Sequence, residues 1–80
     1  MNELAKRRSQ QERTSAMRAR LLDATLELII EQGWSNTSTQ KICQRAGVSR
    51  GAQTHHFPTR ESLLIASVRE MVNRHQRHID

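Results

Sequence analysis

The segment from Ser38 to Phe57 limits the possible folds more than any other part of this chain. It contains two short helix-forming stretches separated by Ala46-Gly47-Val48-Ser49, and a hydroxyl residue that can cap a helix precedes each of them. Gly47 stands where the chain must turn, because glycine reaches positive φ without strain. The pattern predicts two helices joined by a tight turn, the second over about residues 50–56.

Such a pair, with basic and hydrogen-bonding side chains on its second helix, is typical of a helix-turn-helix, whose second helix enters the major groove of DNA. The composition fits a polyanionic partner, because the formal net charge is +5 and the isoelectric point about 11.1. The basic excess is concentrated in residues 1–20. These hold Lys6, Arg7, Arg8, Arg13, Arg18 and Arg20 against Glu3 and Glu12.

Several classes of protein are disfavoured by what the chain contains. A single cysteine excludes an internal disulfide framework, and no apolar run approaches the ~20 residues of a membrane span. The basic N-terminus is not followed by an apolar stretch, so no secretory signal is predicted and we expect a cytoplasmic protein. Trp34 and Phe57 are the only aromatic residues, too few to stack on single-stranded bases. No nucleophile-elbow or phosphate-loop spacing occurs, so neither an enzyme nor a cofactor is predicted.

The first fourteen residues are polar and aperiodic, and we expect them to form a flexible basic arm. The first helix should begin at Thr14 or Ser15 and run to about Gln32, where Gly33 offers a left-handed cap. Trp34 should then pack back on the core. The predicted apolar stripe of this helix is Leu22, Leu26 and Ile29, flanked by Leu21, Thr25 and Leu28.

The second helix should follow a cap at Thr37 or Ser38 and bury Ile42 and Ala46, with Cys43 beside them. Pro58 stops the third helix, and Thr59 should cap a fourth. The apolar side of the fourth helix is Leu63, Leu64, Ala66, Val68, Met71 and Val72. No glycine or proline closes this helix before Asp80, so we expect more protein beyond it. The predicted class is all-α: a three-helix, homeodomain-like head plus the start of a fourth, linking helix.

An ordered series of short motifs now points to a family. It comprises Leu21-Leu22-Asp23-Ala24, Glu31-Gln32-Gly33-Trp34, Thr37-Ser38, Ile42, Ala46-Gly47-Val48-Ser49, Gly51-Ala52, His55-His56-Phe57 and Arg60-Glu61-Ser62-Leu63-Leu64. With these spacings, about residues 17–72 resemble the DNA-binding domain of TetR-family transcriptional regulators. The resemblance implies a DNA-binding head that leads into a larger helical domain, which normally binds a small-molecule inducer and forms the dimer. That second domain is not present in this chain.

The candidate DNA contacts follow from side-chain chemistry and from the resemblance together. Arg50 can grip guanine O6 and N7, and Gly51 lets the helix approach the base edges closely. Free backbone N–H groups at the start of the second helix favour a phosphate oxygen. The predicted contacts are Ser38, Thr39, Gln40, Ser49, Arg50, Gly51, Thr54, His55, His56 and Arg60. The arm residues predicted to reach the minor groove or phosphates are Lys6, Arg7, Arg8 and Arg13.

Gln53-Thr54 stands where the family usually carries Leu-Tyr, so operator preference transfers less well than the fold. The leucine normally faces inward, and Gln53 must therefore find a hydrogen-bond partner or lie at the rim. Adjacent His55 and His56 diverge by about 100° on a helix and cannot easily share a metal ion. His75 and His78 share a helix face but lack a third ligand, so no metal site is predicted. Cys43 is expected to be a small buried residue rather than a catalytic thiol.

The sequence therefore divides into an arm over residues 1–14 and a DNA-binding domain over residues 15–80, with the helix-turn-helix at about residues 38–57. The implied partner is double-stranded DNA with a near-palindromic operator, bound by a homodimer of the full-length protein. An inducer would act through the absent domain, as in the family's repressors. The alternative is a small helical protein-interaction module whose basic face docks an acidic partner.

Overall fold

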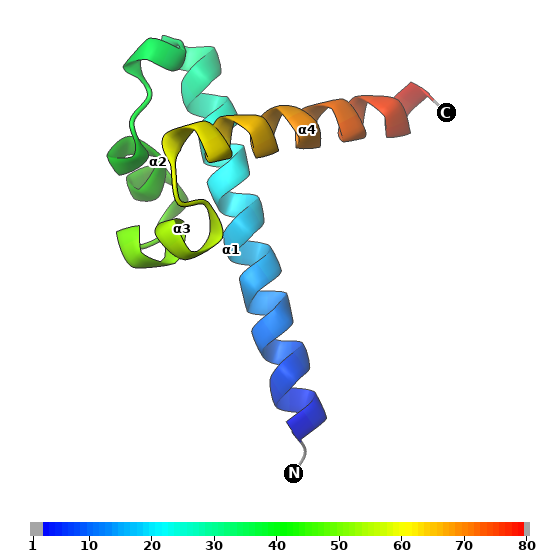
Figure 1. The fold of residues 1–80 in the computed structure, drawn as a ribbon. Helices are drawn as coiled ribbons and strands as arrows, with labels where there is room; N and C mark the ends of the chain where they lie inside the picture. The colour runs from blue at the N-terminus through cyan, green and yellow to red at the C-terminus, as the bar shows by residue number, and fades with distance from the viewer. Residues whose placement is uncertain (1–2, 80) are drawn as a thin grey trace.

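The computed structural model describes the backbone of residues 3–79 and the side chains of residues 9–76. Within that range the chain forms helices and no strand: α1 (Glu3–Gln32), the short 3-10 helix η1 (Trp34–Asn36), α2 (Thr39–Ala46), α3 (Arg50–His56) and α4 (Arg60–Ile79). Figure 1 shows α2 and α3 on one side of α1, while α4 crosses α1 and runs to the other side. The all-α prediction is confirmed. No described helix is both long and apolar enough to cross a membrane.

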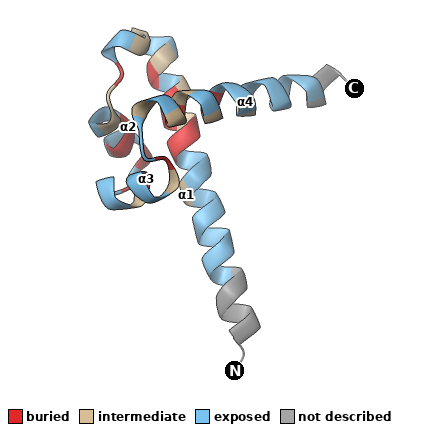
Figure 2. Ribbon diagram, in the orientation of Figure 1, coloured by how far each residue is buried: buried red, intermediate tan, exposed pale blue. Residues whose placement is uncertain are grey.

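The first helix begins earlier than predicted. We expected an aperiodic arm over residues 1–14 and a helix start at Thr14 or Ser15, but α1 is already helical at Glu3. The physical reason is intrinsic propensity, because every residue from 3 to 13 except Ser9 is Glu, Leu, Ala, Lys, Arg or Gln, which all favour helix. Figure 1 shows this part of α1 projecting beyond the core, and residues 9–14, whose side chains are described, are all exposed (Figure 2). Met1 and Asn2 lie outside the described residues.

The core lies where α1, α2, α3 and α4 meet. Its buried apolar residues are Leu21, Leu22, Ala24, Leu28, Ile42, Ala46, Val48, Phe57 and Leu63. The predicted stripe of α1 is displaced, because Leu26 and Ile29 are only half-buried whereas Thr25 is fully buried. Thr25 tolerates burial because its hydroxyl donates to the carbonyl of Leu21 at 2.7 Å, which leaves no unpaired polar group. The face of α1 that packs inward is therefore centred between Leu21 and Thr25.

Gly33 ends α1 at a positive φ of 83°, and its N–H donates to the carbonyl of Ile29 at 2.8 Å, but its ψ of 160° makes it an extended turn and not the left-handed cap that was predicted. Trp34 was predicted to pack back on the core, but it lies half-buried at the edge of the molecule. The buried residue of this connection is Thr37, whose hydroxyl donates to the carbonyl of Gly33 at 2.8 Å. The connection is thus closed by hydrogen bonds and not by aromatic packing.

The fourth helix starts with a reciprocal cap. The N–H of Ser62 donates to the Thr59 hydroxyl at 3.0 Å, and the N–H of Thr59 donates to the Ser62 hydroxyl at 3.1 Å. The predicted cap at Thr59 is confirmed, and Ser62 completes a capping box. Among the described side chains of α4, only Leu63 and Ser67 are buried, while Val68, Met71 and Val72 stay 41–48% exposed. The apolar side predicted for this helix is therefore covered only in its first turns.

Candidate nucleic-acid interface

The turn between α2 and α3 has the geometry that its residues predict. Gly47 adopts the left-handed conformation, with φ 68° and ψ 36°, and the N–H of Val48 donates to the carbonyl of Cys43 at 3.1 Å. Val48 is buried, and the Ser49 hydroxyl accepts a hydrogen bond from the N–H of Ala52 at 3.1 Å. An inward valine followed by a capping serine sets the direction of α3 away from the core.

The outer face of α3 consists of the exposed residues Arg50, Gly51, Thr54 and His55. Among the described side chains, Arg50 makes no hydrogen bond and no ion pair, so its five donors point to solvent. The Thr54 hydroxyl donates to the carbonyl of Arg50 at 2.8 Å, which leaves its methyl group and the two lone pairs of its oxygen available. The rings of His55 and half-buried His56 meet edge to face, with centroids 5.4 Å apart. This face offers donors without any acidic group.

Gly51 has no structural need to be glycine. Its φ lies in the ordinary range, and an added Cβ would meet only the Ser49 hydroxyl, at 4.0 Å. Glycine in a helix costs about 1 kcal/mol relative to alanine, so the fold alone favours a different residue here. The bare backbone at this point leaves open space on the outer face of α3.

The inner side of α3 holds an unusual buried amide. Gln53 is 1% exposed; its side-chain NH₂ donates to the carbonyl of Phe57, and its Oε1 accepts from the Cys43 thiol at 3.9 Å. The prediction that Gln53 needs a hydrogen-bond partner is confirmed, and Cys43 is buried as expected. Burial raises the pKa of the Cys43 thiol, against the opposing effect of the Arg50 charge. A neutral thiol can donate, so Cys43 and Gln53 form one polar pair inside the motif.

The start of α2 presents the other predicted contacts. Ser38 and Thr39 are half-exposed and Gln40 is exposed. The Ser38 hydroxyl accepts a hydrogen bond from the N–H of Lys41 at 3.2 Å, which confirms Ser38 as the cap. Ser38 and Ser49 are thus both helix caps, and their phosphate contacts stay predictions.

Arg60 has a different environment from the one expected of a free phosphate ligand. Its Nη1 donates to the carbonyls of Trp34 at 3.0 Å and Thr37 at 2.6 Å, and its guanidinium carbon lies 3.8 Å from the centroid of the Trp34 ring. Arg60 therefore ties the start of α4 to the connection before α2. Its predicted phosphate contact is untested. That contact would have to use Nε or Nη2, because Nη1 already donates to both carbonyls.

Several acidic side chains of α1 and α4 form ion pairs with arginines outside α3. Arg45 pairs with Glu31 and Glu27, and Arg74 pairs with Asp23 at 2.9 Å and Glu70 at 3.3 Å. The Arg45 hydrogen bond lowers the pKa of the Glu31 carboxyl. Residues 38–57 contain no acidic residue. The surface around α3 is consequently positive, as a polyanion partner requires.

The basic arm is described only in part. The side chains of Lys6, Arg7 and Arg8 lie outside the described residues, and Arg13 is exposed on α1. Sequence reasoning missed the positioning residues Ser62 and Trp34. The hydroxyl pair Thr59-x-x-Ser62 was a readable signal for a capping box. The Arg60 stacking on Trp34 had no local signal, because the two residues are far apart in the sequence.

Comparisons with known proteins agree with this geometry. The family model for bacterial regulatory proteins of the tetR family matches residues 21–67. The chain is 44% identical over 62 residues to the HTH-type transcriptional regulator CymR of Pseudomonas putida, covering 78% of this chain and 30% of the relative. It is 42% identical over 55 residues to the HTH-type transcriptional regulator BetI of Burkholderia thailandensis, covering 69% of this chain and 28% of that relative.

A third relative is an uncharacterised HTH-type transcriptional regulator of Mycobacterium tuberculosis, 42% identical over 67 residues, with 84% of this chain and 34% of the relative covered. The chain thus spans about a third of the length of these curated relatives. No solved structure matches it. The family match covers α2, the turn, α3 and the start of α4, the elements that build the exposed basic face. The chain belongs to the TetR family of bacterial transcriptional regulators and contains its DNA-binding domain.

Proposed function

We propose that this domain recognises a specific double-stranded operator by placing α3 in the major groove. The observation that carries the proposal is the outer face of α3, where Arg50 has no partner among the described side chains and Gly51 leaves the backbone open. An unpaired guanidinium beside an uncovered backbone suits close contact with guanine edges. The half-exposed start of α2 supports the proposal, because its hydroxyl and amide groups lie on the element before the turn and suit a phosphate.

We further propose that the regulator is a repressor that binds a near-palindromic operator as a homodimer, one α3 per half-site. The resemblance to the family supports repression and release by a small-molecule inducer. Two-fold symmetric proteins of this type place their half-sites about one helical turn, or multiples of it, apart. Dimer formation and inducer binding would be carried by a part of the protein outside this domain, and we propose action in the cytoplasm.

Selection from a random duplex pool, followed by competition binding, tests the proposal. The protein should enrich one motif and bind it about 10³-fold or more tightly than random duplex at the same salt. Two chains per selected duplex would support the dimer. Weak, uniform and salt-labile binding to every duplex would contradict the proposal, because that behaviour is expected of a basic protein-interaction module.

A further inference from the structure

The projecting half of α1 carries a polar face with a definite orientation. Gln10, Gln11, Thr14 and Ser15 line a hollow of about 580 Å³, and we call these four residues the polar face of α1. Residues seven or eleven positions apart share one side of a helix. Each residue of the polar face lies at such a spacing before Leu21 or Leu22, both of which are buried. The polar face is thus the continuation of the side of α1 that packs on the core.

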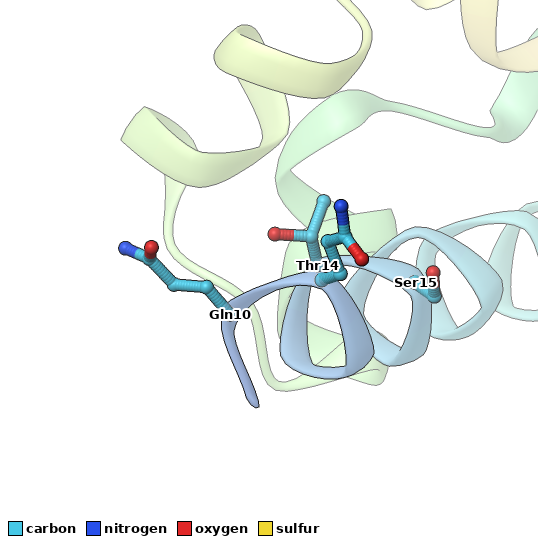
Figure 3. Close-up of a pocket in the computed structure, with 4 residues that line it drawn as sticks. Gln10, Thr14 and Ser15 are labelled. Carbon is cyan, nitrogen blue, oxygen red and sulfur yellow. The ribbon is translucent and has the colours of Figure 1, made fainter. Parts of the chain in front are cut away.

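The polar face of α1 lies next to α3. Arg18 lies one turn after Thr14, and its guanidinium carbon is 5.3 Å from the centroid of the Phe57 ring, at the end of α3. Figure 3 shows Thr14 and Ser15 projecting from α1 on the side where the α3 ribbon passes, in agreement with the placement of α3 beside α1 in Figure 1. Ser15 also lines a smaller hollow together with Glu70 and Arg74 of α4. Gln10, Gln11 and Thr14 are exposed, and this part of the face is open to a partner that already touches α3.

The chemistry of the face is that of a hydrogen-bonding surface. All four side chains are exposed, and none makes a hydrogen bond to another described group. The four described residues that line the hollow all carry polar side chains, whereas the lining of a small-molecule pocket is mostly apolar side chains. Hydroxyl and amide side chains are common donors to phosphate oxygens, and half to two-thirds of protein–DNA hydrogen bonds go to phosphate and sugar.

The charged residues around the polar face favour a polyanion as its partner. Exposed Arg13, Arg18 and Arg20 stand along this half of α1, and Glu12 is the one acidic residue among described residues 9–22. Glu12 lies about 160° around the helix from Gln10 and from Thr14 but only about 60° from Ser15, so it stands at the edge of the polar face. A polyanion that approaches α3 would therefore meet neutral donors on the polar face, within a positive surrounding.

We propose that the polar face of α1 binds the sugar–phosphate backbone of the same duplex that α3 reads. The inference rests on the proposed function, and it replaces a flexible arm with a preformed helix that holds the backbone beside the major-groove contact. The side chains are neutral, so this contact adds affinity without releasing counterions. It therefore differs from the predicted arm contacts of Lys6, Arg7, Arg8 and Arg13.

The test uses the triple variant Gln10→Ala, Gln11→Ala, Thr14→Ala in duplex-binding titrations at several salt concentrations. Losing up to three hydrogen bonds should weaken binding about tenfold to a hundredfold, on the selected site and on random duplex alike. The slope of affinity against salt should stay unchanged. Alanine favours helix more than glutamine or threonine does, so a loss of binding cannot come from a broken helix, and circular dichroism checks this.

Two controls make the result specific. Ser9→Ala removes a hydroxyl from the opposite side of α1 and should leave affinity unchanged, whereas Arg13→Ala should flatten the salt slope if that cation meets a phosphate. Phosphate-ethylation interference should show protected phosphates in the wild-type complex that the triple variant loses.

Unchanged affinity of the triple variant, with a wild-type protein that still prefers its selected site, overturns this inference and leaves the proposed function intact. A loss confined to the selected site also overturns it, because that pattern indicates base contacts. If the wild-type protein shows no preference among duplexes, the proposed function fails, and this inference fails with it.

Discussion

Replacing Arg60 separates a positioning role from a DNA-binding role. In the structure Arg60 donates to two carbonyls, those of Trp34 and Thr37, and stacks on the Trp34 ring. Hydrogen bonds from a charged donor contribute about 1.5–3 kcal/mol each when they are fully buried. Arg60 is only half-buried and water can replace it at these carbonyls, so we take about 1 kcal/mol for each bond. The stacking adds about 0.5–1 kcal/mol.

Arg60→Ala should therefore lower the free energy of unfolding by about 2–3 kcal/mol, measured by urea denaturation with circular dichroism. Arg60→Lys is the matched control, because an ammonium keeps the charge but cannot stack and hold both carbonyls. It should cost about 1–2 kcal/mol, with an unchanged denaturant slope in both variants. The reasoning is refuted if Arg60→Ala unfolds within about 0.5 kcal/mol of wild type while duplex binding collapses, since that would make Arg60 a phosphate ligand first.

Three further predictions concern the motif and its support. Gly51→Ala should raise stability by about 0.5–1 kcal/mol but weaken binding to the selected duplex, and a loss of stability in thermal unfolding would show that the fold needs this glycine. Gln53→Ala should cost about 2–3 kcal/mol through a cavity and an unpaired Phe57 carbonyl, whereas Gln53→Leu fills the cavity but leaves the carbonyl unpaired and should cost about 1–2 kcal/mol; equal urea midpoints for both variants would contradict this account. The Glu31 pKa lies below its ordinary value of 4.5 because of Arg45, so this pair stabilises the fold above that pH and the benefit disappears as pH falls through the lowered pKa. Glu31→Gln should then be less stable than wild type at pH 7, and the difference should shrink as pH falls through the lowered pKa of Glu31; a difference that stays constant with pH would exclude this pair as its source.

The helix-turn-helix was predictable because its determinants are local. Gly47 takes the left-handed conformation, and Ser38 and Ser49 cap the helices that follow them, all within a few residues of the groups they serve. Turn geometry and capping are decided by nearest neighbours in the chain. A single sequence therefore contained enough information to place α2 and α3 within about a residue.

Contacts between distant residues were not predictable in the same way. Arg60 meets the Trp34 and Thr37 carbonyls across 26 and 23 residues, and Arg74 meets Asp23 across 51. The periodicity of the sequence does not indicate which basic residue has a hydrogen-bond partner far away in the chain. Arg60 was consequently assigned to DNA alone, although much of its hydrogen bonding is used inside the fold.

The two errors in α1 have different causes. Its early start was missed because polarity was weighted above helix propensity in residues 3–14. Its core face was displaced because the stripe was centred on Leu22, Leu26 and Ile29 with Thr25 only at its flank, whereas the Thr25 hydroxyl donates to the Leu21 carbonyl and the residue is fully buried. Correct placement of that face is what shows Gln10, Gln11, Thr14 and Ser15 to continue it beyond the core.

The most direct test of the central claim, that the outer face of α3 reads base sequence, compares wild type with Arg50→Ala on the selected duplex and its single-base-pair variants. Arg50 is exposed, so the substitution should leave the fold intact. We predict a loss of about 1–3 kcal/mol on the selected site, with discrimination relaxed at one base pair and random-duplex binding retained at a reduced level. An Arg50→Ala protein with the affinity and base preference of wild type would contradict the claim.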